Sequence, residues 1–184
     1  LHPWKVKERS DQWLNTLTKF IDQTPHALIG EIGLDKWIRD PAFNDQIEAF
    51  ESQLELSAAY KLAPTIHCLK AWGTMLRILK KHSPLPTNFL LHSYSGPREM
   101  LNEFIELGAY FSISGYFARP DKAAKLETWQ QIPIERILIE TDAPDMLPPQ
   151  SLRIDSPRSE QSDSNKEINH PHNIANIYRW FANH

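Results

Sequence analysis

Apolar residues follow two different spacings along this chain, and the two spacings alternate. An apolar residue at every third or fourth position predicts an amphipathic helix, whereas short continuous or alternating apolar runs predict strands. The helical spacing covers residues 11–20, 40–60, 72–79, 99–107, 121–131 and 174–181. The strand-like runs are 27–35, 62–67, 88–92, 110–115 and 137–139. Helices therefore separate five predicted strands, which favours an α/β protein with a parallel sheet.

The last predicted strand is the most apolar, because Ile137, Leu138 and Ile139 follow one another directly. Such a run is typical of a strand buried on both faces. Two further local signals concern helix ends. Pro41 suits the first turn of the predicted helix 40–60. Gly108 is expected to end the predicted helix 99–107 by adopting a left-handed backbone conformation.

Carboxylates and histidines stand where the predicted strands end. Glu31, His67, His92 and Asp142 each lie at or near the carboxyl end of a different strand. In a TIM-type (β/α)8 barrel such residues meet at one face, whereas a doubly wound sheet would spread them along a line. The positions therefore favour a barrel.

Each of these residues also has an ordinary structural explanation. A lone Asp at a strand end is usually a turn residue, and a lone His is more often a satisfied polar side chain than a ligand. Four such residues at equivalent strand ends reverse that preference. Imidazole and carboxylate groups suit Zn²⁺, Mn²⁺ or Fe, and the carboxylates also suit Mg²⁺. A metal held there would acidify water to a pKa of about 7 and polarise a phosphoryl oxygen.

Composition narrows the class of protein. Hydrophobic residues make up 41% and charged residues 23% of the 184 positions, as in soluble globular domains. The net charge of −3 implies no broad basic face, so nucleic acid would be bound only locally. The single cysteine, Cys68, excludes an internal disulfide and suits the cytoplasm. We expect no membrane partner, since no apolar run reaches spanning length. The chain lacks an initiator Met, so a targeting segment could precede Leu1.

Six short motifs follow one another in an order that resembles a known family. They are Leu1-His2-Pro3, the GEIGLD of Gly30–Asp35, Ile66-His67, the HSYSG of His92–Gly96, the ETDAP of Glu140–Pro144, and Asn169 with Pro171. This ordered set resembles the TatD family of metal-dependent hydrolases. The resemblance implies a barrel enzyme that cleaves phosphodiester bonds with metal-activated water, typically a deoxyribonuclease with DNA as substrate.

The resemblance also implies roles for particular residues. One or two divalent ions (Mg²⁺, Mn²⁺ or Zn²⁺) would be held by Glu31, His67, His92 and Asp142. Asp142 and Glu31 would be catalytic, Asp142 by orienting or deprotonating the attacking water and Glu31 by bridging two metals. Glu140 is the alternative to Asp142, because residues two apart in a strand share a face. The expected substrate-binding residues are His2, Lys70 and Ser95.

The chain departs from the family pattern in three places. It begins within the GxHP motif, so the upstream His-x-His strand is absent, and we expect an N-terminally truncated barrel with about five strands. Leu69 and Ile168 replace two familiar arginines. We expect a single domain over 1–184, with a flexible loop at 149–168. A catalytically impaired barrel that only binds a partner, or a hydrolase of a small amide or ester, remain alternatives.

Overall fold

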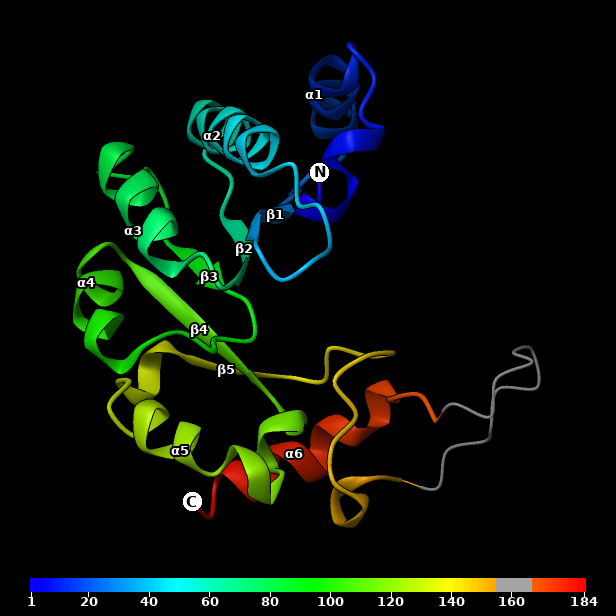
Figure 1. Ribbon diagram of the computed structural model, residues 1–184, viewed down its shortest axis with the longest axis vertical. Coiled ribbons are helices and arrows are strands. Elements are labelled where there is room, and N and C mark those ends of the chain that lie inside the picture. The colour runs from blue at the N-terminus through cyan, green and yellow to red at the C-terminus, as the bar shows by residue number, and fades with distance from the viewer. Residues whose placement is uncertain (155–166) are drawn as a thin grey trace. The chain divides into compact units, whose positions relative to one another are not determined.

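The computed structural model describes residues 1–154 and 167–184. The chain forms two compact units, Leu1–Tyr110 and Phe111–His184, and each is described by itself (Figure 1). The predicted alternation of helices and strands is confirmed in both. No helix within these described ranges is long and apolar enough to cross a membrane.

The first unit contains three complete parallel strands and four α-helices. The elements are η1 (Pro3–Glu8), α1 (Trp13–Gln23), β1 (Ile29–Asp35), α2 (Phe43–Tyr60), β2 (Pro64–Leu69), α3 (Trp72–Lys81), β3 (Phe89–Leu91), η2 (Arg98–Met100) and α4 (Leu101–Glu106). Strand β1 pairs with β2, and β2 pairs with β3, both in parallel. Helix α2 packs on β1, and α3 packs on β2 (Figure 1).

The two faces of β2 have different surroundings. Pro64, Ile66 and Cys68 are buried, and the residues between them are only half-buried. This alternation follows from the two-residue period of a strand. The buried face belongs to the core, where Phe50 and Leu54 of α2 and Met75 and Leu79 of α3 are fully buried. The half-buried face carries His67.

Strand β1 approaches β2 through a glycine. Gly33 pairs in register with His67, and its φ of 140° is rarely adopted by a residue with a side chain. A Cβ atom at Gly33 would lie 2.0 Å from the backbone oxygen of His67. Glycine at this position therefore permits the close pairing of β1 with β2.

Two helical expectations in this unit need correction or refinement. Helix α2 begins at Phe43, so Pro41 lies before its first turn, because the chain first turns through a left-handed Ala42 with φ 44°. The predicted apolar stripe of the first helix is present in α1, yet none of the residues of α1 is buried. Gly108 does adopt the expected positive φ, at 94°.

The second unit is built on one parallel strand pair. Strand β4 (Ala109–Ser114) begins in the last two residues of the first unit and pairs with β5 (Ile137–Glu140). The other elements are η3 (Gly115–Ala118), η4 (Pro120–Lys122), α5 (Ala124–Trp129), η5 (Ile134–Arg136), η6 (Gln150–Leu152), η7 (Pro171–Asn173) and α6 (Ile174–Phe181). Helix α6 packs against β5 (Figure 1).

The expected burial of the last strand on both faces is wrong. Leu138, at the centre of β5, is 46% exposed. Within the second unit β5 pairs with β4, and one face of the pair leaves Leu138 accessible. The predicted flexible loop at 149–168 is described only at its flanks, where Leu152 is buried and the Ile154 N–H donates to Asn173 Oδ1. Its central part, 155–166, lies outside the described residues.

Candidate metal centre

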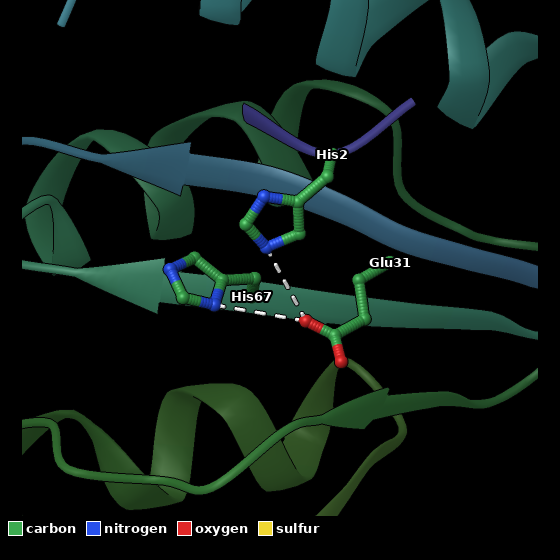
Figure 2. A group of neighbouring side chains, drawn as sticks. All are labelled: His2, Glu31 and His67. Atoms are coloured by element: carbon green, nitrogen blue, oxygen red, sulfur yellow. Dashed lines mark ion pairs between the residues drawn. The ribbon is translucent and has the colours of Figure 1, made fainter. Parts of the chain in front are cut away.

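Three histidines surround one carboxylate in the first unit. Figure 2 shows His2 from the N-terminal segment, Glu31 from β1 and His67 from β2 converging on one another. Glu31 Oε2 lies 3.5 Å from His2 Nε2 and 3.7 Å from His67 Nδ1. Glu31 Oε1 lies 3.6 Å from His92 Nε2. Both oxygens of Glu31 therefore face imidazole nitrogens.

The sheet places these side chains. Glu31 is in β1, and His67 is in β2 on the face opposite the core. His92 directly follows β3, and its backbone N–H donates to the Ile66 oxygen at 2.9 Å, which continues the pairing of β3 with β2. Glu31 lies in the irregular stretch of β1 between Ile29 and Ile32, and His67 lies inside β2, so neither stands at the predicted carboxyl end of its strand; only His92 follows one.

The spacing around Glu31 fits a divalent cation. The nitrogen–oxygen distances of 3.5–3.7 Å exceed those of normal N–H···O hydrogen bonds, which are about 2.7–3.2 Å. His67 and His92 are mostly buried, with side chains 13% and 12% exposed. Burial lowers the pKa of the His67 ring, which favours its neutral, ligating form. Neutral imidazoles facing a carboxylate form a typical donor set for Zn²⁺ or Mn²⁺.

His2 differs from the other two histidines. Its Nδ1 accepts a hydrogen bond from the Trp4 backbone N–H at 3.2 Å, so the proton of the neutral ring is on Nε2. The Nε2 of His2 faces Glu31 Oε2 at 3.5 Å, and this long contact is the largest influence that lowers the pKa of Glu31. His2 is therefore suited to donate a hydrogen bond and is poorly suited to hold a metal through Nε2.

Asp35 is a member of this cluster that the sequence reasoning missed. It ends β1, is fully buried, and its Oδ2 lies 3.0 Å from His67 Nε2. Burial opposes its charge, but hydrogen bonds from Trp4, Trp37 and His67 outweigh this and lower its pKa. A second acid that ends the same strand as Glu31, within the GEIGLD motif, was the signal that could have revealed it.

The other predicted residues of the first unit lie in turns. Lys70 is exposed, directly follows β2 and has a φ of 53°. Ser95 is half-buried in the turn that follows His92. The substrate-binding roles of Lys70 and Ser95 remain predictions.

Asp142 belongs to the second unit. It comes two residues after β5 ends at Glu140, and its backbone is left-handed, with φ 57°. The expectation that Glu140 and Asp142 share one face of a strand therefore does not hold, because the strand has ended before Asp142. Asp is one of the residue types that adopt this conformation most readily.

Asn169 holds the segment that carries Asp142. Its side chain is buried, and its Nδ2 donates to the backbone oxygens of Thr141 and Met146 at 2.6 and 3.3 Å. Its Oδ1 accepts from the His170 N–H and from Asn173 Nδ2. Asn169, the last Asn of the family-like motifs, thus acts as a clamp: its hydrogen bonds tie the two ends of segment 141–146 together.

Replacing Asn169 by Asp should release this segment. The carboxylate keeps the size of the amide but turns an N–H donor into an acceptor facing two carbonyl oxygens. We expect a loss of about 1–3 kcal/mol in the free energy of unfolding for the broken buried bonds, measured by urea denaturation, with faster amide exchange in 141–146. Asn183→Asp, at an exposed position of the C-terminal tail, is the control and should change neither. Equal behaviour of the two variants would disprove the clamp.

The fold and the histidine–carboxylate cluster define an α/β protein of the barrel type with a candidate divalent-metal centre. The profile of the family described as TatD related DNase matches residues 1–184. The chain belongs to this family. The expected fold class is confirmed, since the five strands match part of a TIM-type barrel.

Similar proteins include two curated relatives and one solved structure. The chain is 31% identical over 148 residues to the uncharacterized metal-dependent hydrolase YjjV of Escherichia coli, matching 79% of this chain and 57% of that protein. It is 32% identical to the 3'-5' ssDNA/RNA exonuclease TatD of a Pantoea species, and the match covers 98% of this chain and 68% of that protein. The crystal structure of E. coli YjjV, a TatD homologue, superposes with a TM-score of 0.85 at 26% identity, over all of this chain and 66% of the other. The chain thus spans roughly three fifths to two thirds of its relatives' length.

Proposed function

We propose that this protein is a metal-dependent hydrolase that cleaves phosphodiester bonds in single-stranded nucleic acid, most naturally DNA. The observation that carries the proposal is the carboxylate of Glu31 with His67 and His92 directed at its two oxygens. The name of the Pantoea relative, an exonuclease on single-stranded DNA and RNA, supports this substrate class.

Glu31, His67 and His92 would hold the divalent ion, and Asp142 is proposed as a further ligand on the strength of the ETDAP motif alone. The donor set suits Mn²⁺ or Zn²⁺, and Mg²⁺ would rely on the carboxylates. When bound, such an ion supplies Lewis acidity, which polarises a phosphoryl oxygen and makes water more acidic.

The protein's own groups would perform the remaining tasks. In the substrate complex His2 would donate its Nε2–H, which faces Glu31 only at the long distance of 3.5 Å, to a non-bridging phosphate oxygen, since its Nδ1 is already an acceptor. The Lys70 ammonium, exposed directly after β2, would pair with a neighbouring phosphate. A carboxylate oxygen of Asp142 would accept the proton of the attacking water. The net charge of −3 favours such local contacts over general phosphate binding.

The decisive experiment incubates the full natural protein with an end-labelled, single-stranded oligonucleotide in the presence of Mg²⁺, Mn²⁺ or Zn²⁺. Stepwise shortening that a chelator abolishes is the expected result. Turnover of small amide or ester substrates, with the oligonucleotide left intact under every metal, would replace this proposal with the alternative hydrolase.

Removing either proposed histidine ligand should weaken metal binding. Loss of a residue that merely supports a ligand costs about 10–100-fold in metal affinity, so His67→Ala and His92→Ala should each cost at least that much. Titration calorimetry with Mn²⁺ and metal analysis of the purified protein would measure it. His184→Ala, at the exposed C-terminus, is the control. If both variants bind Mn²⁺ as well as the control, the two histidines are not ligands.

A further inference from the structure

We propose that Asp35 is the positioning residue of this centre: it fixes His67 in the Nε2–H tautomer and so turns the lone pair of His67 Nδ1 toward Glu31. The inference builds on the proposed metal-dependent function and assigns a role to a residue outside the ligand set. The His67 ring lies between two carboxylates. Its Nδ1 is 3.7 Å from Glu31 Oε2, and its Nε2 is 3.0 Å from Asp35 Oδ2.

The strand pattern explains this arrangement. Glu31 and Asp35 occupy positions before and after Gly33, and Gly33 pairs in register with His67. Although β1 is irregular between Ile29 and Ile32, the two acids flank the place opposite His67, as their distances of 3.7 and 3.0 Å to its ring nitrogens show. The two nitrogens of one imidazole ring can therefore each reach a different carboxylate.

The hydrogen bonds of Asp35 establish the direction of its bond to His67. Asp35 Oδ1 accepts from the backbone N–H groups of Trp37 and Ile38, at 2.7 and 3.3 Å. Asp35 Oδ2 accepts from the Trp4 indole N–H at 2.7 Å. A carboxylate surrounded by donors is an acceptor only. His67 must therefore supply the proton, from Nε2, and in the neutral ring Nδ1 then has none.

Trp4 makes this assignment more specific. Its backbone N–H donates to His2 Nδ1, while its indole N–H donates to Asp35. The first bond leaves the proton of His2 on Nε2, and the second helps to orient the carboxylate that places the proton of His67 on Nε2. As a result, Glu31 Oε2 faces an N–H group from His2 and a lone pair from His67. Trp4 thereby supports two histidines with opposite roles. His2 is left as a hydrogen-bond donor for substrate, and His67 is left as a ligand for metal.

The sharpest test is Asp35→Asn. The two backbone N–H groups at Oδ1 require an oxygen there, so the new amide NH₂ would take the place of Oδ2 and face His67 Nε2. A donor at that place requires a lone pair on Nε2, which moves the ring proton to Nδ1, the atom that faces Glu31. Shape is preserved, but the Trp4 indole N–H also loses its acceptor at Oδ2, a loss that Trp4→Phe reproduces without changing Asp35. We expect metal affinity to fall by about 10–100-fold.

The measurement is long-range ¹H–¹⁵N correlation NMR of His67 in metal-free protein, together with Mn²⁺ binding by calorimetry. The natural protein should show the Nε2–H tautomer, and Asp35→Asn the Nδ1–H tautomer with weaker Mn²⁺ binding. An Nδ1–H ring in the natural protein overturns the inference by itself, whether or not the variant folds. An unchanged tautomer in a folded variant overturns it too.

Trp4→Phe separates this role from ordinary packing. The variant keeps an aromatic ring and the backbone N–H to His2 but loses the indole donor to Asp35. We expect the Nε2–H tautomer of His67 to survive; its loss would assign the tautomer to Trp4 instead of Asp35. Since the tautomer is read without metal or substrate, this test stands apart from the oligonucleotide assay, whose failure would reject the proposed function alone.

Discussion

Substitution of Asp142 by Asn is expected to lower the rate of oligonucleotide hydrolysis by about 10²–10⁴-fold, the usual value of general-base assistance. Asn has nearly the shape of Asp but lacks its charge and basicity. The left-handed backbone at Asp142 should tolerate the exchange, because Asn adopts that conformation as readily as Asp does. The fold should therefore remain while the reaction is lost. The assay uses the full natural protein, a short DNA strand and saturating Mg²⁺ or Mn²⁺.

Glu140→Gln is the matched control. Glu140 is the last residue of β5, two positions before Asp142, and it is the other carboxylate of the ETDAP motif. We expect this variant to retain much more activity than Asp142→Asn. The opposite ranking would show that Glu140, and not Asp142, is the base.

Gly33→Ala should have the largest effect on stability. A Cβ atom would lie 2.0 Å from the His67 backbone oxygen, and the φ of 140° would be strained for alanine. Neither problem can be relieved without separating β1 from β2. We expect a loss of more than about 4 kcal/mol in the free energy of unfolding, which belongs to the severe class of point mutations. Urea denaturation followed by circular dichroism would measure it.

Gly73→Ala provides the comparison. Gly73 lies in the first turn of α3, and a Cβ there would have no heavy atom within 4 Å. The same chemical change should be neutral or stabilising by up to about 1 kcal/mol, since alanine is the better helix former. Similar unfolding curves for the two variants would show that the β1–β2 pairing does not depend on Gly33.

The order and type of the elements could be predicted because each carries its own local signal. The stripe of Phe50 and Leu54 is buried in α2 as expected, and the predicted strand before His67 is present as β2, which continues to Leu69. The convergence of Glu31, His67 and His92 was predictable from their places on neighbouring parallel strands. The predicted strand ends were wrong for two of them, because Glu31 and His67 lie inside β1 and β2 and only His92 follows its strand. Short-range periodicity and strand direction were sufficient for these features.

Features that depend on tertiary contacts or on single backbone angles were not predictable. Leu138 is apolar and sits in an apolar run, but its exposure depends on which face of β5 is covered. The left-handed Ala42 delays the start of α2 to Phe43, and the left-handed Asp142 lies two residues beyond the end of β5; no local residue pattern marks either angle. Asp35 was missed because its role requires knowing that His67 pairs opposite Gly33.

The alternation of β2 separates two kinds of selective pressure. Ile66 and Cys68 face the packed side of the strand, and His67 faces the other. Substitutions of Ile66 or Cys68 therefore act on the packed core, whereas substitutions of His67 act on its contacts with Glu31 and Asp35. Because the three residues are consecutive, their effects still couple through the shared backbone. In this layout, evolvability of the reaction is partly uncoupled from the stability of the scaffold.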